Sequence, residues 1–162
     1  MRLNWREELF GALKAAGKVA VLGIGSPLNS DDAAGMLLIE KLEGHGLKQA
    51  EVLLIAASSA PENFTGVIGD FAPELLLAVD AARLGLEPGK VALLEKEELC
   101  GAGFSTHMLP FSIMLQYLYS RGLANVLLLG IEPQNTEFGL EISLPVQRAV
   151  AEIADFLALT LR

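Results

Sequence analysis

The stretch VAVLGIGSPLNSDDAAG, residues 19–35, decides the fold. Its apolar start predicts a buried strand, which runs into the turn Gly23-Ile24-Gly25. Two acids, Asp31 and Asp32, follow at the start of an expected helix. A strand that passes through a glycine turn into a helix is typical of α/β proteins, whose sites lie at the carboxyl ends of the strands. We therefore expect a functional site at this turn.

Strands and helices are expected to alternate along the rest of the chain. The strands are predicted at Lys18–Leu22, Glu51–Ala57, Glu74–Val79, Val91–Leu94 and Asn125–Gly130, with an extended segment at Leu140–Ser143. The helices are predicted at Asn4–Ala16, Asp31–Leu42, Pro61–Phe71, Leu109–Arg121 and Pro145–Leu161. This alternation favours an α/β fold, in the form of a three-layer α/β/α sandwich. The sheet is expected to be twisted and mostly parallel, with about five strands and with helices on both faces.

Two of the expected strands have a specific place in that sheet. Glu74–Val79 is apolar after its first residue, which is typical of a central parallel strand buried on both faces. Val91–Leu94 follows a connection that is too tight for a right-handed crossover. We therefore expect Val91–Leu94 to run antiparallel at an edge of the sheet.

Composition limits the class of protein. The 162 residues are expected to form a single domain, with residues 1–17 as an extra N-terminal helix, and 52% of them are hydrophobic, which argues against disorder. The net charge of −8 argues against nucleic acid as a partner. No apolar run approaches the roughly 20 residues of a membrane span, and the N-terminus does not resemble a secretory signal. The single cysteine, Cys100, suits a reducing cytoplasm.

The turn Gly23-Ile24-Gly25 also raises the alternative of a nucleotide-binding, Rossmann-like protein. The dinucleotide fingerprint needs a third glycine three positions further on, where this chain has Leu28. No acid ends the second strand, which carries Ala56 and Ala57 instead. We therefore expect no nucleotide cofactor, and the glycines are equally typical of a plain tight turn.

Two carboxylates and one imidazole are candidates for chemistry. Asp32 begins a helix, Asp80 closes an apolar strand, and His107 precedes a helix. Together they form a three-ligand set with open positions, which suits a divalent metal that also binds something else. Each of these residues could instead have a purely structural role. Ser30 or an acid at the helix start could cap the helix, Asp80 could form an Asx turn, and His107 could cap a helix or be exposed to solvent.

The remaining candidate side chains are less informative. His45 lies in a Gly-His-Gly connection and is expected to be exposed. Cys100 is expected to be a half-buried, small apolar residue. A nucleophilic pair of Cys100 with His107 has no supporting motif.

The sequence resembles the nickel–iron hydrogenase maturation endopeptidases along nearly its whole length after the N-terminal helix. Among them it looks most like the branch that processes hydrogenase 3 of the formate hydrogenlyase type. The order and spacing of five blocks carry the resemblance: VLGIGSPLNSDDAAG (residues 21–35), SAPEN (59–63), LLLAVDAARLGLEPG (75–89), STHMLP (105–110) and VLLLGIEPQ (126–134).

The resemblance implies an α/β/α fold and an activity. Members remove a C-terminal extension from the hydrogenase large-subunit precursor, which is therefore the implied partner. The resemblance also implies nickel as the metal, which in that family arrives already bound in the precursor and serves as the recognition signal. The family's three metal-contacting residues correspond to Asp32, Asp80 and His107, which are thereby the implied metal ligands and catalytic residues.

Two departures from the family pattern leave an alternative open. Ser26 stands where the family usually has Asn, and Ala56-Ala57-Ser58 stands where it often has Asp-Gly-Gly. A chain without that acid could also be a non-catalytic module that binds nickel or the precursor. For an active enzyme, nickel acts as the Lewis acid, or a carboxylate acts as the base in the manner of an aspartyl protease.

Overall fold

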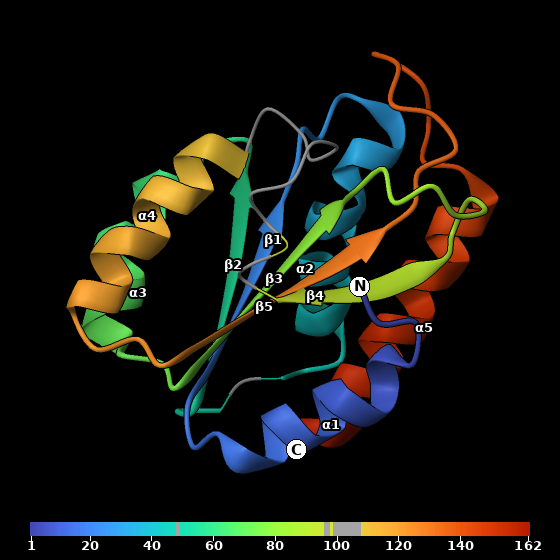
Figure 1. Ribbon diagram of the computed structural model, residues 1–162. Coiled ribbons are helices and arrows are strands. Elements are labelled where there is room, and N and C mark those ends of the chain that lie inside the picture. Colours follow the sequence, from blue (N-terminus) through green and yellow to red (C-terminus); the bar gives the residue numbers. More distant parts are fainter. Residues whose placement is uncertain (48, 96–97, 99–107) are drawn as a thin grey trace.

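The sheet is built around one strand that is buried along its whole length. The structure is a computed structural model that describes residues 1–47, 49–95, 98 and 108–162. In this part of the chain the strands are β1 (Val19–Ile24), β2 (Val52–Ser58), β3 (Leu75–Ala81), β4 (Val91–Glu95) and β5 (Asn125–Ile131). They form one sheet in the order β2-β1-β3-β5-β4, with β3 at its centre (Figure 1). The predicted central strand is thus confirmed.

The direction of the strands also follows the prediction. β1 runs parallel to β2 and to β3, and β3 runs parallel to β5. β4 lies at the edge and pairs antiparallel with β5, with Val91 opposite Ile131. The short connection after β3 allows this return but no helical crossover. The expected mostly parallel sheet with one antiparallel edge strand is confirmed.

Helices cover both faces of the sheet (Figure 1). They are α1 (Trp5–Ala15), α2 (Ala34–Gly44), α3 (Thr65–Phe71), α4 (Met108–Ser120) and α5 (Leu144–Thr160). Alternate residues of β3 enter two separate cores: Leu75, Leu77 and Val79 pack with α1, α2 and α5, whereas Leu76 and Ala78 pack with α3 and α4. Because successive strand residues point to opposite faces, one apolar strand supplies both cores. The predicted three-layer sandwich is confirmed.

Two local expectations are wrong in detail. The helix expected from Asp31 begins as a 3₁₀ turn, η1 (Ser30–Ala33), before α2, and the one expected from Pro61 begins as η2 (Pro61–Phe64) before α3. Neither Ser30 nor Asp31 caps α2, whose N-cap is Ala33. Both side chains bind distant segments instead: the Ser30 hydroxyl donates a hydrogen bond of 2.7 Å to the Glu141 oxygen, and Asp31 accepts bonds from residues 134, 135 and 143. The segment Leu140–Ser143 belongs to no strand, and Ser143 at its end has extended backbone angles.

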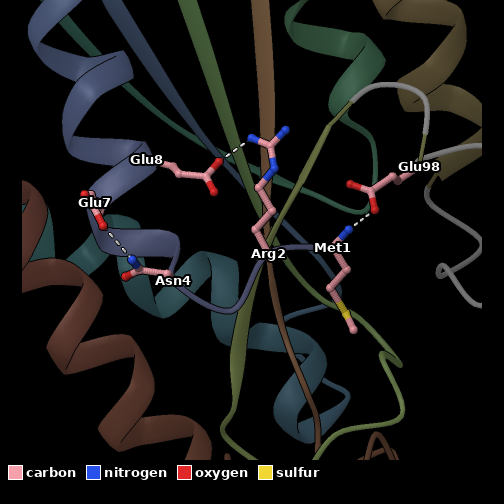
Figure 2. Close-up of polar contacts among 6 residues, drawn as sticks. All are labelled: Met1, Arg2, Asn4, Glu7, Glu8 and Glu98. Carbon is pink, nitrogen blue, oxygen red and sulfur yellow. Dashed lines mark hydrogen bonds and ion pairs between the residues drawn. The ribbon is translucent and has the colours of Figure 1, made fainter.

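The N-terminal segment covers the outer edge of β4. The backbone of Arg2 exchanges two hydrogen bonds with that of Leu93, of 2.9 and 3.0 Å. In addition, the Arg2 side chain pairs with Glu8, and the amino group of Met1 pairs with Glu98 (Figure 2). Exposed pairs of this kind contribute little stability. The backbone bonds matter more, because they satisfy an edge strand that would otherwise be open to pairing.

Among the helices that the structure describes, none combines the length and the apolar character that a membrane span needs.

Candidate active site at the carboxyl edge of the sheet

The turn after β1 brings Asp32 and Asp80 to one place. Because β1 and β3 are neighbours, with Gly23 opposite Val79, the end of β1 lies beside Asp80. Gly25 has φ +125°, and a Cβ atom there would lie 1.8 Å from the Asp32 backbone oxygen and 3.3 Å from Asp80 Oδ1. Only a glycine fits between these two residues. Two acids that are far apart in the sequence therefore border the same turn.

A backbone N–H holds the Asp32 side chain in the turn. The Ser26 N–H donates a hydrogen bond of 2.9 Å to Asp32 Oδ2, and Asp32 is only 7% exposed. A charge-assisted bond of this kind fixes the orientation of a carboxylate. The donor is a main-chain group, so it does not depend on the side chain at position 26. The replacement of the family's usual Asn by Ser26 leaves this contact available.

Asp80 is a buried acid inside a strand. It pairs in register with Gly130 of β5, it is 2% exposed, and its Oδ1 atom has less than 1 Å² of accessible surface. The alternative of an Asx turn at Asp80 is wrong, because the Ala82 N–H that would close it donates to the Ile131 oxygen instead. Asp80 continues the alternation of Leu76 and Ala78, so its side chain points to the face that α3 and α4 cover.

The structure describes two of the three predicted site residues. His107 and Cys100 lie outside the described residues. α4, which begins at Met108, packs on the same face of the sheet to which Asp80 points. Within the described residues, no group of three or more His, Cys, Asp or Glu side chains is placed to hold a metal. The described part of the candidate site is thus the pair Asp32 and Asp80.

The other histidine takes no part in this site. His45 follows α2 at the opposite end from η1, and its Nε2 lies 3.2 Å from an oxygen of Asp155 on α5. The Asp155 side chain is 70% exposed. His45 is exposed as predicted, and its contact is an ordinary surface pair.

The two other glycines of the first block have a packing role. A Cβ atom on Gly23 would lie 2.2 Å from the Gly35 oxygen, and one on Gly35 would lie 2.4 Å from the Ile24 oxygen. α2 therefore approaches β1 more closely than side chains would allow. This close packing accounts for the glycines without a bound nucleotide.

Asp31 has a structural role next to the site, because its side chain binds a distant segment of the chain. This fully buried carboxylate accepts hydrogen bonds from the N–H groups of Gln134, Asn135 and Ser143 and from the Ser143 hydroxyl, at 2.7 to 3.1 Å. Its own N–H donates to the Asn135 oxygen. Asp31 therefore ties the long connection between β5 and α5 to η1. Of the two neighbouring acids, Asp31 has the structural role and Asp32 borders the site.

Replacing Asp31 by asparagine should lower the free energy of unfolding by about 3 kcal/mol. A hydrogen bond to a charged group contributes about 1.5–3 kcal/mol, and the NH₂ group of asparagine would point at N–H groups that need an acceptor. Urea unfolding followed by circular dichroism measures the change. Asp70→Asn is the matched control, since Asp70 is exposed on α3. A loss no larger than that of Asp70→Asn would contradict the structural role of Asp31.

Glu132 is a site-forming residue that the sequence analysis missed. It follows β5 directly, it is 7% exposed, and its Oε2 accepts hydrogen bonds from the N–H groups of Leu84, at 2.5 Å, and Leu86, at 3.2 Å. These bonds shape the loop that leaves β3 just after Asp80. The sequence carried a signal for it, since Glu132, like Asp80, is an acid at the end of an apolar strand.

The segment that departs from the family pattern borders the same turn. Ser58 has φ +54°, and its oxygen accepts a hydrogen bond of 2.9 Å from the Gly25 N–H. Ala56 is exposed and pairs in register with Gly23. The position where the resemblance leads us to expect an acid is thus at this edge of the sheet, on the strand next to β1.

Comparisons with known proteins identify the family. The family model of the hydrogenase maturation proteases of HycI type matches residues 36–158. The hydrogenase 3 maturation protease of Escherichia coli is 30% identical over 134 residues, which cover 82% of this chain and 84% of that protein. A Methanocaldococcus jannaschii protein, provisionally named a hydrogenase maturation protease, is 32% identical over 139 residues, which cover 82% of each chain.

A solved structure supports the same assignment. The crystal structure of the [NiFe] hydrogenase maturation protease HycI from Thermococcus kodakarensis superposes with a TM-score of 0.86 at 29% identity. The superposition covers 95% of this chain and 98% of that one, so the fold is shared over nearly the whole length. Since the family model, the relatives and the fold agree, this chain belongs to the hydrogenase maturation proteases and is an endopeptidase of that family.

Proposed function

We propose that this endopeptidase removes the C-terminal extension of a nickel–iron hydrogenase large-subunit precursor after nickel has been inserted. The nickel ion is part of the substrate, and the enzyme recognises it through Asp32, Asp80 and His107. The observation that carries the proposal is that Asp32 and Asp80 both lie against Gly25, where a Cβ atom would be 1.8 Å from the Asp32 backbone oxygen and 3.3 Å from Asp80 Oδ1. The name of the Escherichia coli relative supports a precursor of the hydrogenase 3 type.

The chemistry of the three side chains fits this role. Carboxylates and imidazole are common ligands of divalent transition metals, and three of them leave positions on the ion for ligands from the precursor. Asp32 is already oriented by the Ser26 N–H, and Asp80 is rigidly held within the central strand. Oriented ligands of this kind bind an ion without further rearrangement of the enzyme.

Peptide hydrolysis then needs a polarised carbonyl group and an activated water. Nickel bound to the precursor can polarise the carbonyl group as a Lewis acid. In the other route, nickel only positions the scissile bond, and a carboxylate of the pair takes the proton from the attacking water. Both routes place water rather than a side chain as the nucleophile, so neither involves a covalent acyl-enzyme.

Incubation of the purified protein with purified precursor tests the proposal. The nickel-loaded precursor should yield one shortened product and one C-terminal peptide, both identified by intact-mass spectrometry. The nickel-free precursor is the matched control and should remain whole. Equal cleavage of both forms would contradict recognition through nickel, and a stable complex without a shortened product would contradict the proposed reaction.

A further inference from the structure

A groove of about 570 Å³ begins beside the candidate site and lies between α2 and α5. Ala33, the residue after Asp32, is at its start, and Leu37 and Lys41 continue along α2. Leu37 and Lys41 are four apart on α2 and share one face, and Ala33 directly precedes that helix, so the three positions span roughly 12 Å at about 1.5 Å per residue. Leu144 and Arg148 are the corresponding positions on α5. The groove is long enough for a short peptide segment.

Large apolar side chains are exposed around this groove. Leu140 and Leu144 line it and are 50% and 64% exposed. Leu28 and Phe138 are 61% and 76% exposed, and they lie next to the groove because the Gly139 N–H donates to the Leu28 oxygen. Singly exposed apolar residues are ordinary on a protein surface, but a group of them around a groove indicates a binding surface.

The charge of the groove is opposite to that of the whole chain. The chain carries a net charge of −8, yet Lys41 and Arg148 both line the groove, with Glu141 as its single acid among the described residues. In the part of the chain that the structure describes, neither cation makes an ion pair. An apolar groove with two available cations is complementary to a segment that combines apolar and acidic side chains.

We infer that this groove binds an apolar, acidic segment of the protein substrate, as a second contact away from the scissile bond. The inference rests on the proposed function, because it takes the hydrogenase precursor as the substrate. The groove and the site share the loop from Pro27 to Ala33, so one bound protein can occupy both. A contact that is made equally in the ground state and in the transition state lowers KM and leaves the chemical step unchanged, and we assign the groove this kind of contact.

Substitution of Leu144 and of Arg148 tests the inference. Leu144→Asp and Arg148→Glu should each raise KM for the nickel-loaded precursor about tenfold or more, since contacts at the centre of an interface commonly change affinity by this factor. The kcat value should stay within about twofold of that of the parent protein. Arg148→Lys, which keeps the charge, should recover most of the lost affinity.

The same helix provides matched controls. Leu159 is 75% exposed on α5, and Arg162 follows that helix; neither lines the groove. Leu159→Asp and Arg162→Glu should leave KM unchanged, and urea unfolding should show that all four charge-changing variants are folded. An unchanged KM for both Leu144→Asp and Arg148→Glu would overturn the inference.

Two further outcomes would overturn the inference, each for a different reason. If the parent protein does not process the precursor at all, the proposed function fails, and the inference fails with it. If Leu144→Asp converts a dimer into a monomer in sedimentation experiments without changing KM, the groove binds a second copy of this chain instead of the substrate.

Discussion

Replacing Asp80 by asparagine is expected to abolish cleavage of the nickel-loaded precursor, with a fall in kcat/KM of at least about 10³-fold. The amide has the same shape as the carboxylate but no negative charge for the metal or for the proton of the attacking water. Asp80 is 2% exposed in the central strand, so the amide occupies the same space. The rate of product formation, followed by intact-mass spectrometry, measures the effect.

The fold of the Asp80→Asn protein should remain intact, as shown by an unchanged far-ultraviolet circular dichroism spectrum. His107→Ala is expected to abolish cleavage in the same way, because His107 is the third ligand in the proposed site. Asp70→Asn is the control for a changed carboxylate elsewhere and should cleave at the parent rate. Cleavage at the parent rate by Asp80→Asn would remove Asp80 from the mechanism.

Gly25→Ala is expected to cause the second largest effect, because no methyl group fits at this position. The new Cβ would lie 1.8 Å from the Asp32 oxygen, so the turn must move and separate Asp32 from Asp80. We expect a loss of at least about 100-fold in kcat/KM, since a displacement of about 1 Å at a positioned group has this consequence. The free energy of unfolding should fall by roughly 3 kcal/mol.

Gly122→Ala is the matched control for Gly25→Ala. Gly122 has φ +99°, and a Cβ atom there would meet nothing within 4 Å. This variant therefore isolates the cost of the backbone conformation, about 1 kcal/mol, from the cost of the collision. Equal losses of stability and activity in Gly25→Ala and Gly122→Ala would contradict the claim that the turn at Gly25 positions Asp32 and Asp80.

The fold could be predicted from the sequence because its signals are local. Every residue of Leu75–Val79 is apolar, which is typical of a parallel strand covered on both faces. The short connection before Val91 allowed an antiparallel return and excluded a crossover, and the structure has that return. Each of these features depends on neighbouring residues, so a single sequence contains the information.

The different roles of Asp31 and Asp32 could not be predicted from local signals. Both acids begin a helix, where capping is the usual role, but Asp31 binds residues 134, 135 and 143. These partners are more than a hundred positions away, and periodicity contains no information on such contacts. Glu132 is different, because its place at the end of an apolar strand marks it as a candidate, but its donors lie in a loop that precedes it by more than forty residues and could not be predicted.

Crystals of the protein soaked with nickel, measured at the nickel absorption edge, test the central claim most directly. We predict an anomalous peak between Asp32 and Asp80, with a carboxylate oxygen of each at about 2.0–2.2 Å, the range of comparable metal–oxygen bonds, and with the imidazole of His107 as a further ligand. A peak found only at another place, such as the surface pair of His45 and Asp155, would contradict the account.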